Sequence, residues 1–506
     1  MACRYVLGID QGTTGTKVLV FDKDGDVKGR AYSELQQRFP RPGWVEHDPE
    51  EIYEVSRKVA QRALNDAGAA PEDIAGIGIT NQRETTVMWE RESGKPVANA
   101  IVWQDRRTAG LCDHLRSEGL EPQVRDKTGL VIDAYFSATK AHWYLNNISG
   151  LTERARRGEI AMGTIDSWMI YKLTGGRVHA TDYSNASRTL LYNIFDLEWD
   201  EELLEIFGVP REVLPEVRPS SGDFGVTDPG AFLGAGIPVA GILGDQQAAL
   251  FAQACYSEGQ AKNTYGTGSF LLMNTGTEAA RSRGGSLTTI GWRVGGGDVE
   301  YALEGAIFIT GAAVQWLRDG LGIVESAAET EELATSVKSA GGVFMVPAFV
   351  GLGAPHWDSY ARGTILGITR GTTRSHLARA ALESIAFQTR DCVDAMEEDS
   401  GIKLQELRAD GGAVANAFLM QFQADILGVP VLVPKISDTT ALGSASMAGL
   451  ATGFWESRKE LDERWTLARR FDPQMSEDER EALHARWQQA VERAKGWAQP
   501  EEVDLG

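Results

Sequence analysis

Apolar residues in the first 80 positions form short strand-like runs separated by polar, glycine-rich turns. The runs RYVLGID (4–10) and KVLVFD (17–22) flank the turn QGTTGT, and a second turn signal, KDGD, follows. Two apolar runs joined by such a turn predict a β-hairpin. A helix is predicted at about 49–68, with Asp48-Pro49-Glu50-Glu51 as its cap and first turn, and IAGIGIT (74–80) predicts a buried strand.

The same pattern returns half a chain length later. AKNTYGTGSFLLMNTG, which starts at residue 261, again has the order strand, Gly/Thr turn, strand, so that Thr13 and Thr267 occupy equivalent turns. A repeat of this kind predicts two similarly built α/β domains with a cleft between them. We expect the domains to span 1–252 and 253–506, with the boundary near 250–260.

The second half continues with alternating elements. Residues 341–355 predict a strand entering a Gly/Pro loop, 376–396 have helical periodicity, and 407–428 predict strand, double glycine and helix. The segment 455–506 is charged, and we expect it to be mostly helical and to pack outside the core.

Composition excludes several classes of protein. The chain has 506 residues, with 71 acidic and 50 basic side chains and a formal charge of −21. A protein with such a surplus of acidic side chains lacks the positive charge that binding to nucleic acid or to an anionic membrane requires. The four cysteines are scattered without a Cys-x-x-Cys pair, and neither a signal peptide nor an apolar run long enough to span a bilayer is apparent. We therefore expect a soluble, cytoplasmic protein with no nucleic-acid partner and no membrane insertion.

Three Gly/Thr or Gly/Gly turns follow strands, which is an arrangement that nucleotide phosphates require. Glycine lets backbone N–H groups approach phosphate oxygens, and threonine hydroxyls add donors. The first turn, Gly12 to Lys17, fails as a Walker loop because two residues separate its glycines and a strand follows it. The alternative to a phosphate-binding loop at Gly12 to Lys17 is an ordinary glycine-rich turn. Asp10 beside this turn indicates Mg²⁺, since a carboxylate repels phosphate unless a cation bridges them, or else it is a turn-initiating aspartate.

Other polar residues near predicted strand ends are candidates for substrate chemistry. Arg83-Glu84 follows IAGIGIT, and both side chains can reach one small ligand only if the chain bends there; the alternative is a surface ion pair. Asp245 opens a helix after Gly244, where it fits either a general base or a helix N-cap, and Gln246 fits a pocket donor or a solvated residue. Trp103 and Phe270 are pocket walls or ordinary core aromatics. The histidines show no metal-ligand spacing, and no Gly-x-Ser-x-Gly elbow supports a serine hydrolase.

Taken together, these motifs resemble the FGGY family of sugar and polyol kinases, and within it the glycerol kinases. The resemblance runs over roughly residues 4–450. It is carried by LGIDQGTTGTKVLVFD, ITNQRETTVMWE, IVWQDRR, YFSATKAHWYL, GDQQAALFAQ, NTYGTGSF, EGAIFITGAAVQWLRD, GTILGITRGTTRSHLARAALES and DGGAVANAFLMQFQADILG. The resemblance implies two actin/hexokinase-like (ribonuclease H-like) domains flanking a central cleft, with ATP and Mg²⁺ as cofactors and glycerol as the substrate. A homo-oligomer, dimer or tetramer, is also expected.

The resemblance also implies roles for individual residues. Glycerol hydroxyls would bond Arg83, Glu84, Tyr135, Asp245 and Gln246, while Trp103 and Phe270 would wall the carbon skeleton. Asp245 would be the general base and Asp10 would lie at the Mg²⁺. The residues implied at ATP are Thr13, Thr14, Gly15, Lys17, Thr267, Gly311, Gln315, Gly412 and Asn416.

Two other functions stay open at this point. One is a kinase for another polyol or a ketose, and the other is an actin- or chaperone-like ATPase, which would have no need of the Arg83-Glu84 pair. Some glycerol kinases bind fructose 1,6-bisphosphate through a glycine and an arginine in a loop before the Gly-Asp-Gln-Gln motif. Here that loop has Gly234, but Gly236 stands in place of the arginine, and no histidine lies between His179 and His356. We therefore expect neither this inhibition nor histidine phosphorylation in the loop.

Overall fold

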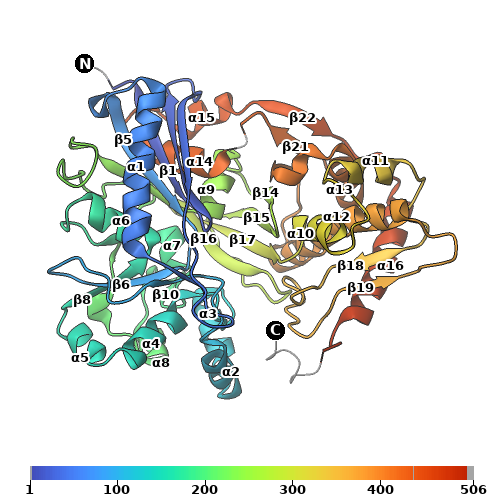
Figure 1. Ribbon diagram of the computed structural model, residues 1–506, viewed down its shortest axis with the longest axis horizontal. Helices are drawn as coiled ribbons and strands as arrows, with labels where there is room; N and C mark the ends of the chain where they lie inside the picture. The colour runs from blue at the N-terminus through green and yellow to red at the C-terminus, as the bar shows by residue number, and fades with distance from the viewer. Residues whose placement is uncertain (1–2, 437, 499–506) are drawn as a thin grey trace.

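The first half of the molecule is built on a five-stranded sheet, shown on the left of Figure 1. The computed structural model describes residues 3–436 and 438–498. The sheet has the order β13-β5-β1-β2-β3, in which β1 is antiparallel to β2 and parallel to β5. Its strands are β1 (Tyr5–Gln11), β2 (Gly15–Asp22), β3 (Val27–Glu34), β5 (Ile74–Asn81) and β13 (Val239–Gly244). The β1–β2 pair is the predicted hairpin, and the strand predicted at 74–80 is β5.

The second half repeats this arrangement in a seven-stranded sheet with the order β16-β17-β15-β14-β20-β21-β22. Here β14 is antiparallel to β15 and parallel to β20, as β1 is to β2 and β5. The strands are β14 (Gln260–Tyr265), β15 (Ser269–Gly276), β16 (Leu287–Arg293), β17 (Val299–Ile307), β20 (Glu406–Gly411), β21 (Val431–Pro434) and β22 (Leu467–Phe471). The prediction of two similarly built α/β halves is confirmed, and the division at residues 252 and 253 stays a proposal.

Helix α1 (Pro49–Ala67) covers one face of the first sheet. It begins where the sequence predicts, because the Asp48 side chain accepts a hydrogen bond from the backbone N–H of Glu50. Its buried stripe includes Ile52 and Val59, which share a core cluster with Leu7 of β1. The apolar residues spaced by about 3.6 positions on the helix and by two on the strand thus pack against each other in one apolar layer.

Helix α14 (Thr439–Ala451) covers the opposite face of the first sheet, although it comes from the last fifth of the chain. Three strand glycines lie directly beneath its backbone. A Cβ atom at Gly8 would lie 2.5 Å from the Ala441 carbonyl oxygen, and one at Gly78 would lie 2.0 Å from that of Ser444. Gly241 is equally crowded, so only glycine permits this close packing.

The second sheet is covered by α12 (Arg374–Ser400) and α13 (Ala417–Leu427), and α16 (Glu477–Ala494) packs on α13 and on the β18–β19 pair. The prediction that 455–506 packs outside the core is wrong for α16. Trp487 of this helix is fully buried, stacks on Phe387 with ring centroids 5.3 Å apart, and donates a hydrogen bond from its indole to Asp391. The many charges of α16 occupy only its solvent face, and β22 in the same segment completes the sheet edge.

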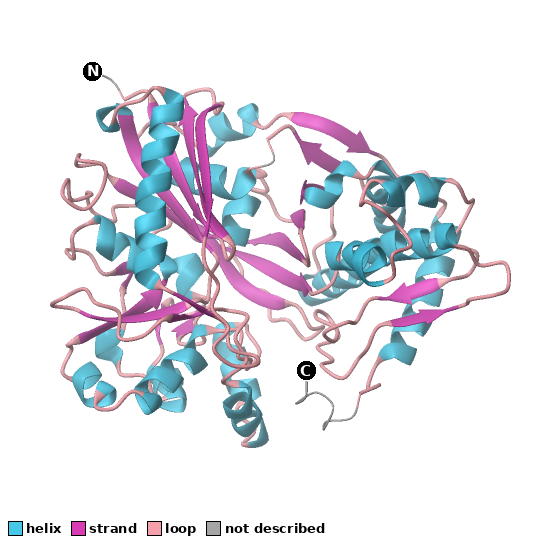
Figure 2. Ribbon diagram, viewed as in Figure 1, coloured by secondary structure: helices cyan, strands magenta, loops and turns pink. Residues whose placement is uncertain are grey.

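Smaller elements surround the two sheets (Figure 2). A four-stranded sheet β4-β7-β6-β8 and three strand pairs, β10-β11, β9-β12 and β18-β19, are attached to the two halves. Their strands are β4 (Glu46–His47), β6 (Thr86–Glu90), β7 (Ala100–Ile101), β8 (Ile160–Thr164), β9 (Ala180–Asp182), β10 (Tyr192–Asn193), β11 (Glu198–Trp199), β12 (Glu216–Arg218), β18 (Phe344–Val346) and β19 (Thr364–Leu366). The remaining α-helices are α2 (Ala109–Ser117), α3 (Glu121–Thr128), α4 (Ser137–Asn147), α5 (Leu151–Arg156), α6 (Ile165–Leu173), α7 (Tyr183–Ala186), α8 (Glu201–Phe207), α9 (Asp245–Ala252), α10 (Gly311–Gln315), α11 (Glu329–Thr335) and α15 (Arg458–Arg464). Within the described residues, every helix is too short or too polar to cross a bilayer.

Candidate active site

The chain bends sharply where β5 ends, and this bend turns Arg83 and Glu84 inward. Both residues have positive φ angles, 51° and 44°, which residues other than glycine rarely adopt. Both are buried, with exposed fractions of 1% and 0%. The alternative of a surface ion pair is therefore excluded, and the bend supplies what two neighbouring side chains need to reach one ligand.

Arg83 and Glu84 belong to a buried network of four charges that joins the two halves. Glu304 of β17 accepts hydrogen bonds from Arg83 and Arg188, with Oε1 lying 3.2 Å from Arg83 Nη2 and 2.9 Å from Arg188 Nη2. Arg188 Nε also donates to Glu84 at 2.7 Å. Two cations alternate with two anions, so each charge has an opposite partner, as burial requires.

The charges in this network are mutually stabilised. Although burial opposes ionisation, Arg188 and Arg83 lower the pKa of Glu304 to about 2. Burial raises the pKa of Glu84, against the influence of the same two arginines. One oxygen of Glu84, Oε2, is buried and makes no hydrogen bond among the described residues. It is an acceptor at this bend that a ligand hydroxyl can satisfy.

Asp245 is the first residue of α9, immediately after the end of β13. Its Oδ1 lies 3.1 Å from Arg83 Nε, and a quarter of its side chain is exposed. Gly244 occupies the cap position of this helix, and Asp245 Oδ1 accepts a hydrogen bond from the backbone N–H of Gln246 at 2.7 Å, so Asp245 also satisfies a donor at the helix start. Asp245 is thus a partly accessible carboxylate at a helix N-terminus beside a buried guanidinium, and Gln246 follows it directly.

Three aromatic rings stand around these polar groups. The ring of Trp103 lies 5.5 Å from Tyr135 and 6.4 Å from Phe270, measured between centroids, and Phe270 lies beneath the Arg83 guanidinium. The Tyr135 hydroxyl accepts from Arg83 Nη2 at 3.4 Å. All seven residues predicted to contact the substrate are thus brought together, and Phe270 comes from the second sheet.

The turn between β1 and β2 holds the first predicted phosphate loop. Thr13, Thr14 and Gly15 form it, and the Thr13 hydroxyl accepts a hydrogen bond from the indole of Trp103 at 2.9 Å. This bond connects the loop to the aromatic wall. Lys17 lies on β2 with Nζ 2.9 Å from Asp438 Oδ1, and Arg30 pairs with the other oxygen of the same aspartate, so two cations share one anion.

Asp10 lies within β1, opposite Lys17, which excludes a turn-initiating role. Its Oδ2 accepts from the hydroxyl of Thr440, and burial raises the pKa of Asp10 to about 6. A nearby cation would relieve that cost of ionisation. Among the described residues no cluster of three His, Cys, Asp or Glu could hold a metal. A lone carboxylate fits Mg²⁺, which prefers one or two carboxylates together with phosphate oxygens and water.

The remaining predicted nucleotide residues lie at the corresponding turns of the second sheet. The carbonyl of Thr267, between β14 and β15, accepts from the N–H groups of Thr310 and Ala312, which dock the start of α10 on this turn. Gly311 and Gln315 belong to that helix. Gly412 has open space where a Cβ would stand, and Asn416 caps α13 through Leu419 N–H at 2.9 Å.

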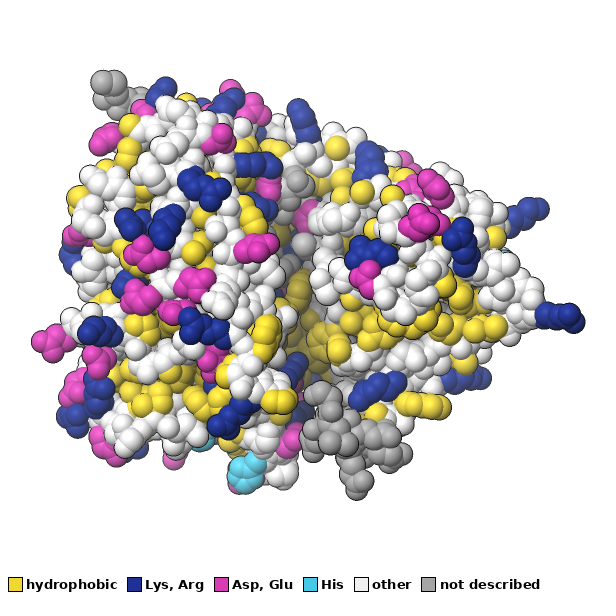
Figure 3. All heavy atoms as spheres, in the orientation of Figure 1, with side chains coloured by type: hydrophobic (Ala, Val, Ile, Leu, Met, Phe, Trp, Pro, Cys, Tyr) yellow, Lys and Arg dark blue, Asp and Glu magenta, His cyan; other side chains and the backbone are white. Residues whose placement is uncertain are grey.

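The surface is hollowed between the two halves of the molecule (Figure 3). The two Gly/Thr turns, at Thr13 and Thr267, are equivalent positions of the repeated sheets. Two family models match the two halves of the chain. Residues 5–252 match the N-terminal domain of the FGGY family of carbohydrate kinases, and residues 261–452 match its C-terminal domain.

The chain belongs to the FGGY family of carbohydrate kinases. Among curated relatives of this FGGY kinase, "Glycerol kinase 2" of Thermotoga maritima is 61% identical over 98% of this chain and 99% of its own length. The glycerol kinase of Carboxydothermus hydrogenoformans is 60% identical over the same shares. Among solved structures, Plasmodium falciparum glycerol kinase with ADP has a TM-score of 0.91 and 38% identity, covering 97% of this chain and 98% of that one.

Three buried charged residues of this FGGY kinase are not predicted from its sequence. Arg188 and Glu304 complete the four-charge network, and Lys262 of β14 is a buried cation beside Gln246. Each is a lone charge within an apolar or small-residue run, which is the only signal that the sequence offers. Such a pattern is hard to distinguish from a solvated strand residue until the partners are known.

Proposed function

We propose that this FGGY kinase phosphorylates glycerol, with ATP as phosphoryl donor and sn-glycerol 3-phosphate as product. The observation that carries the proposal is the buried Arg83-Glu84 bend with Asp245 beside it. It combines donors and acceptors for several hydroxyls beside the three aromatic rings. The relatives at about 60% identity over nearly the whole chain bear the name glycerol kinase, which supports the same activity.

In the proposed reaction Asp245 accepts the proton of the attacking glycerol hydroxyl. Its carboxylate is partly accessible, and the Arg83 guanidinium at 3.1 Å holds it in place. The hydroxyl oxygen forms a bond to the γ-phosphorus, and the bond from that phosphorus to the ADP oxygen breaks. Glu84, Tyr135 and Gln246 would orient the other hydroxyls, so the protein contributes chiefly position and charge.

The two turns would hold the nucleotide. Thr13, Thr14 and Gly15 would donate to phosphate oxygens from the first sheet, with Lys17 adding charge, and the second sheet would contribute the other predicted residues, namely Thr267, Gly311, Gln315, Gly412 and Asn416. Asp10 would hold Mg²⁺ together with the phosphates, and the ion would neutralise charge on the transferring group.

A polyol panel tests the proposal. We expect glycerol to be the best acceptor in a coupled ADP-release assay that includes xylulose, ribitol, erythritol and both propanediols. Because the site leaves buried polar groups unpaired when a hydroxyl is missing, 1,2-propanediol should have a kcat/KM lower by a factor of about 10² or more. Comparable kcat/KM values for glycerol and 1,2-propanediol would refute the hydroxyl-binding roles of Arg83 and Glu84.

The panel also separates the alternatives. Gluconate and xylulose kinases from Lactobacillus acidophilus share the fold with TM-scores of 0.84 but only 21% identity, which supports no choice of substrate. Turnover of a ketose in preference to glycerol would favour another kinase of the family. ATP hydrolysis that no polyol stimulates would favour an actin- or chaperone-like ATPase. A cytoplasmic location and assembly as a homo-oligomer remain parts of the proposal.

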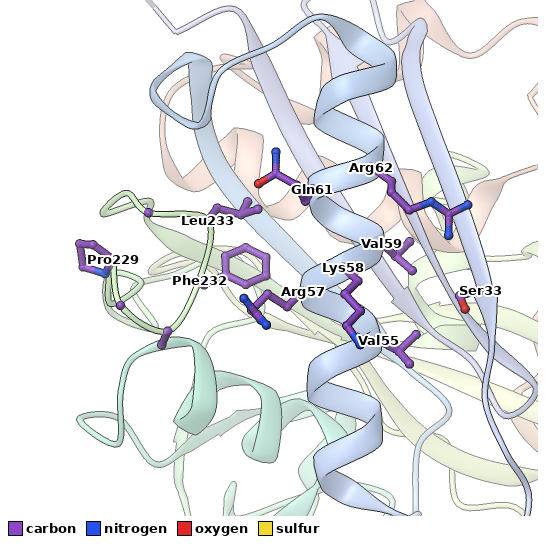
Figure 4. A pocket seen from close by; sticks show the side chains of 13 residues that line it. Ser33, Val55, Arg57, Lys58, Val59, Gln61, Arg62, Pro229, Phe232 and Leu233 are labelled. Atoms are coloured by element: carbon purple, nitrogen blue, oxygen red, sulfur yellow. The ribbon is translucent and has the colours of Figure 1, made fainter.

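A pocket on the first half bears on regulation (Figure 4). It has a volume of about 630 Å³ and lies between α1 and the loop that contains Phe232 and Gly234. Arg57, Lys58 and Arg62 of α1 line it, while the loop itself has Gly236 where an arginine would grip phosphate.

We expect activity to be insensitive to fructose 1,6-bisphosphate. Loss of a charge-assisted contact costs about 1.5–3 kcal/mol, and the net charge of −21 adds repulsion toward a polyanion. The measurement is the glycerol kinase rate during titration into the millimolar range at fixed saturating ATP. Saturable inhibition that Arg62→Ala abolishes would contradict this expectation and assign the phosphate site to α1.

A further inference from the structure

Lys262 is a buried cation at the inner edge of the proposed substrate site. It lies on β14 of the second sheet, with an exposed fraction of 0%. Its Nζ donates to Gln246 Oε1, to Thr264 Oγ1 at 3.1 Å and to the Phe270 carbonyl at 3.1 Å. An ammonium group has three N–H donors and no acceptor, so these three bonds use all of them. Lys262 therefore has no donor left for a substrate and acts on the site through its partners.

The partner that matters is Gln246. Because Lys262 only donates, the oxygen of the Gln246 amide has to face it, and the NH₂ end has to face the other way. Among the described residues nothing accepts from Gln246 Nε2, and this nitrogen is absent from the fully buried, unpaired side-chain atoms. It thus retains access to solvent, and Gln246 directly follows the partly exposed Asp245 at the start of α9. The amide consequently offers the cleft a donor, where Glu84 and Asp245 offer acceptors.

We propose that Lys262 is a positioning residue that holds the Gln246 amide with its NH₂ group toward the cleft, where that group donates to a substrate hydroxyl. The inference rests on the proposed glycerol kinase activity and deepens it by assigning the polarity of one hydroxyl contact. A role in packing alone does not require a cation here, since burying an ammonium group costs free energy that an apolar side chain would not.

The surroundings of Lys262 make this role sensitive to pH. The charged groups that face it are Asp245 at the start of α9, Arg83 at the bend, Glu304 on β17 and Asp410 on β20. Burial lowers the pKa of Lys262 to about 8, while Asp410 and Asp245 raise it. The Glu304 carboxylate, whose pKa is lowered to about 2, and the Arg83 guanidinium, whose pKa is raised by its acidic neighbours, both stay charged between pH 7 and pH 9.5. Above pH 8 a neutral Lys262 amine can accept as well as donate, so the amide is free to turn its oxygen to the cleft.

The first experiment measures glycerol binding by calorimetry without ATP for Lys262→Met, Gln246→Leu and the double variant. We expect each single variant to weaken glycerol binding by about tenfold or more. The double variant should bind as weakly as one single variant, because both remove the same contact. Additive losses, or normal glycerol binding by a folded Lys262→Met protein, would overturn the proposal.

The second experiment relies first on the wild-type enzyme, so its main result does not depend on the folding of a variant. For the wild-type enzyme, kcat/KM for glycerol should fall as pH rises through 8, with KM rising while kcat changes little. Lys262→Arg, whose guanidinium stays charged, should flatten this profile. A flat wild-type profile between pH 7 and 9.5 would overturn the inference. Absence of glycerol phosphorylation by the wild type at any pH would instead refute the proposed function, so the two failures are distinguishable.

Discussion

Asp245→Asn will lower kcat for glycerol by about 10²- to 10⁴-fold while ATP binding is retained. Asparagine preserves the shape of the side chain and its place beside Arg83 but cannot take a proton from the attacking hydroxyl. Steady-state turnover and nucleotide binding by calorimetry measure the two effects separately.

Asp113→Asn provides the matched control for this change. Asp113 lies on α2, is exposed, and among the described residues forms an ion pair with Arg116 alone. The same chemical change there should leave kcat within twofold of the wild type, since surface ion pairs contribute little. Near-normal turnover by Asp245→Asn would reduce Asp245 to a residue that orients the substrate.

Glu304→Gln will destabilise the protein by about 3–5 kcal/mol and abolish tight glycerol binding. Glu304 is the shared anion of Arg83 and Arg188, and both guanidinium groups are buried. Without its charge, two cations face each other with Glu84 and Asp245 as their remaining partners. Arg83 would then leave the position in which it meets Asp245. Thermal unfolding by calorimetry and a glycerol titration measure the two consequences.

Glu300→Gln is the control for this variant. Glu300 lies on the same strand and pairs with Arg458, whose side chain is 39% exposed. We expect it to cost at most about 1 kcal/mol and to leave glycerol binding intact. If Glu304→Gln were as stable as Glu300→Gln and bound glycerol normally, the network would be dispensable both for the fold and for the site.

The sequence reveals the parts of this site that depend on local pattern. The turns at Thr13 and Thr267 are predicted by two apolar runs on either side of glycine and threonine, and Asp245 by its place between a strand and a helix. These features can be predicted because residues adjacent in the chain define them. From the sequence one can say only that Arg83 and Glu84 reach one ligand if the chain bends there. The positive φ angles in the structure show that it does bend.

Long-range pairing explains what the sequence does not reveal. Glu304 meets Arg83 across 221 positions, and Lys262 reaches Gln246 only after the two sheets have come together. Nothing near these residues in the chain indicates a partner. The same reasoning accounts for the error in the last segment, where the charges of α16 obscure a buried stripe that includes Trp487, Ala490 and Val491.

The packing of α14 on Gly8, Gly78 and Gly241 imposes an order on biosynthesis. The first sheet is complete once residue 244 has been made, but the helix that covers one of its faces is made some 200 residues later. Until then Val6, Leu19 and Phe21 lack the apolar neighbours with which they form a core cluster. The nascent first half therefore leaves the ribosome with an open apolar sheet face, and it becomes resistant to aggregation only when the C-terminal fifth has emerged.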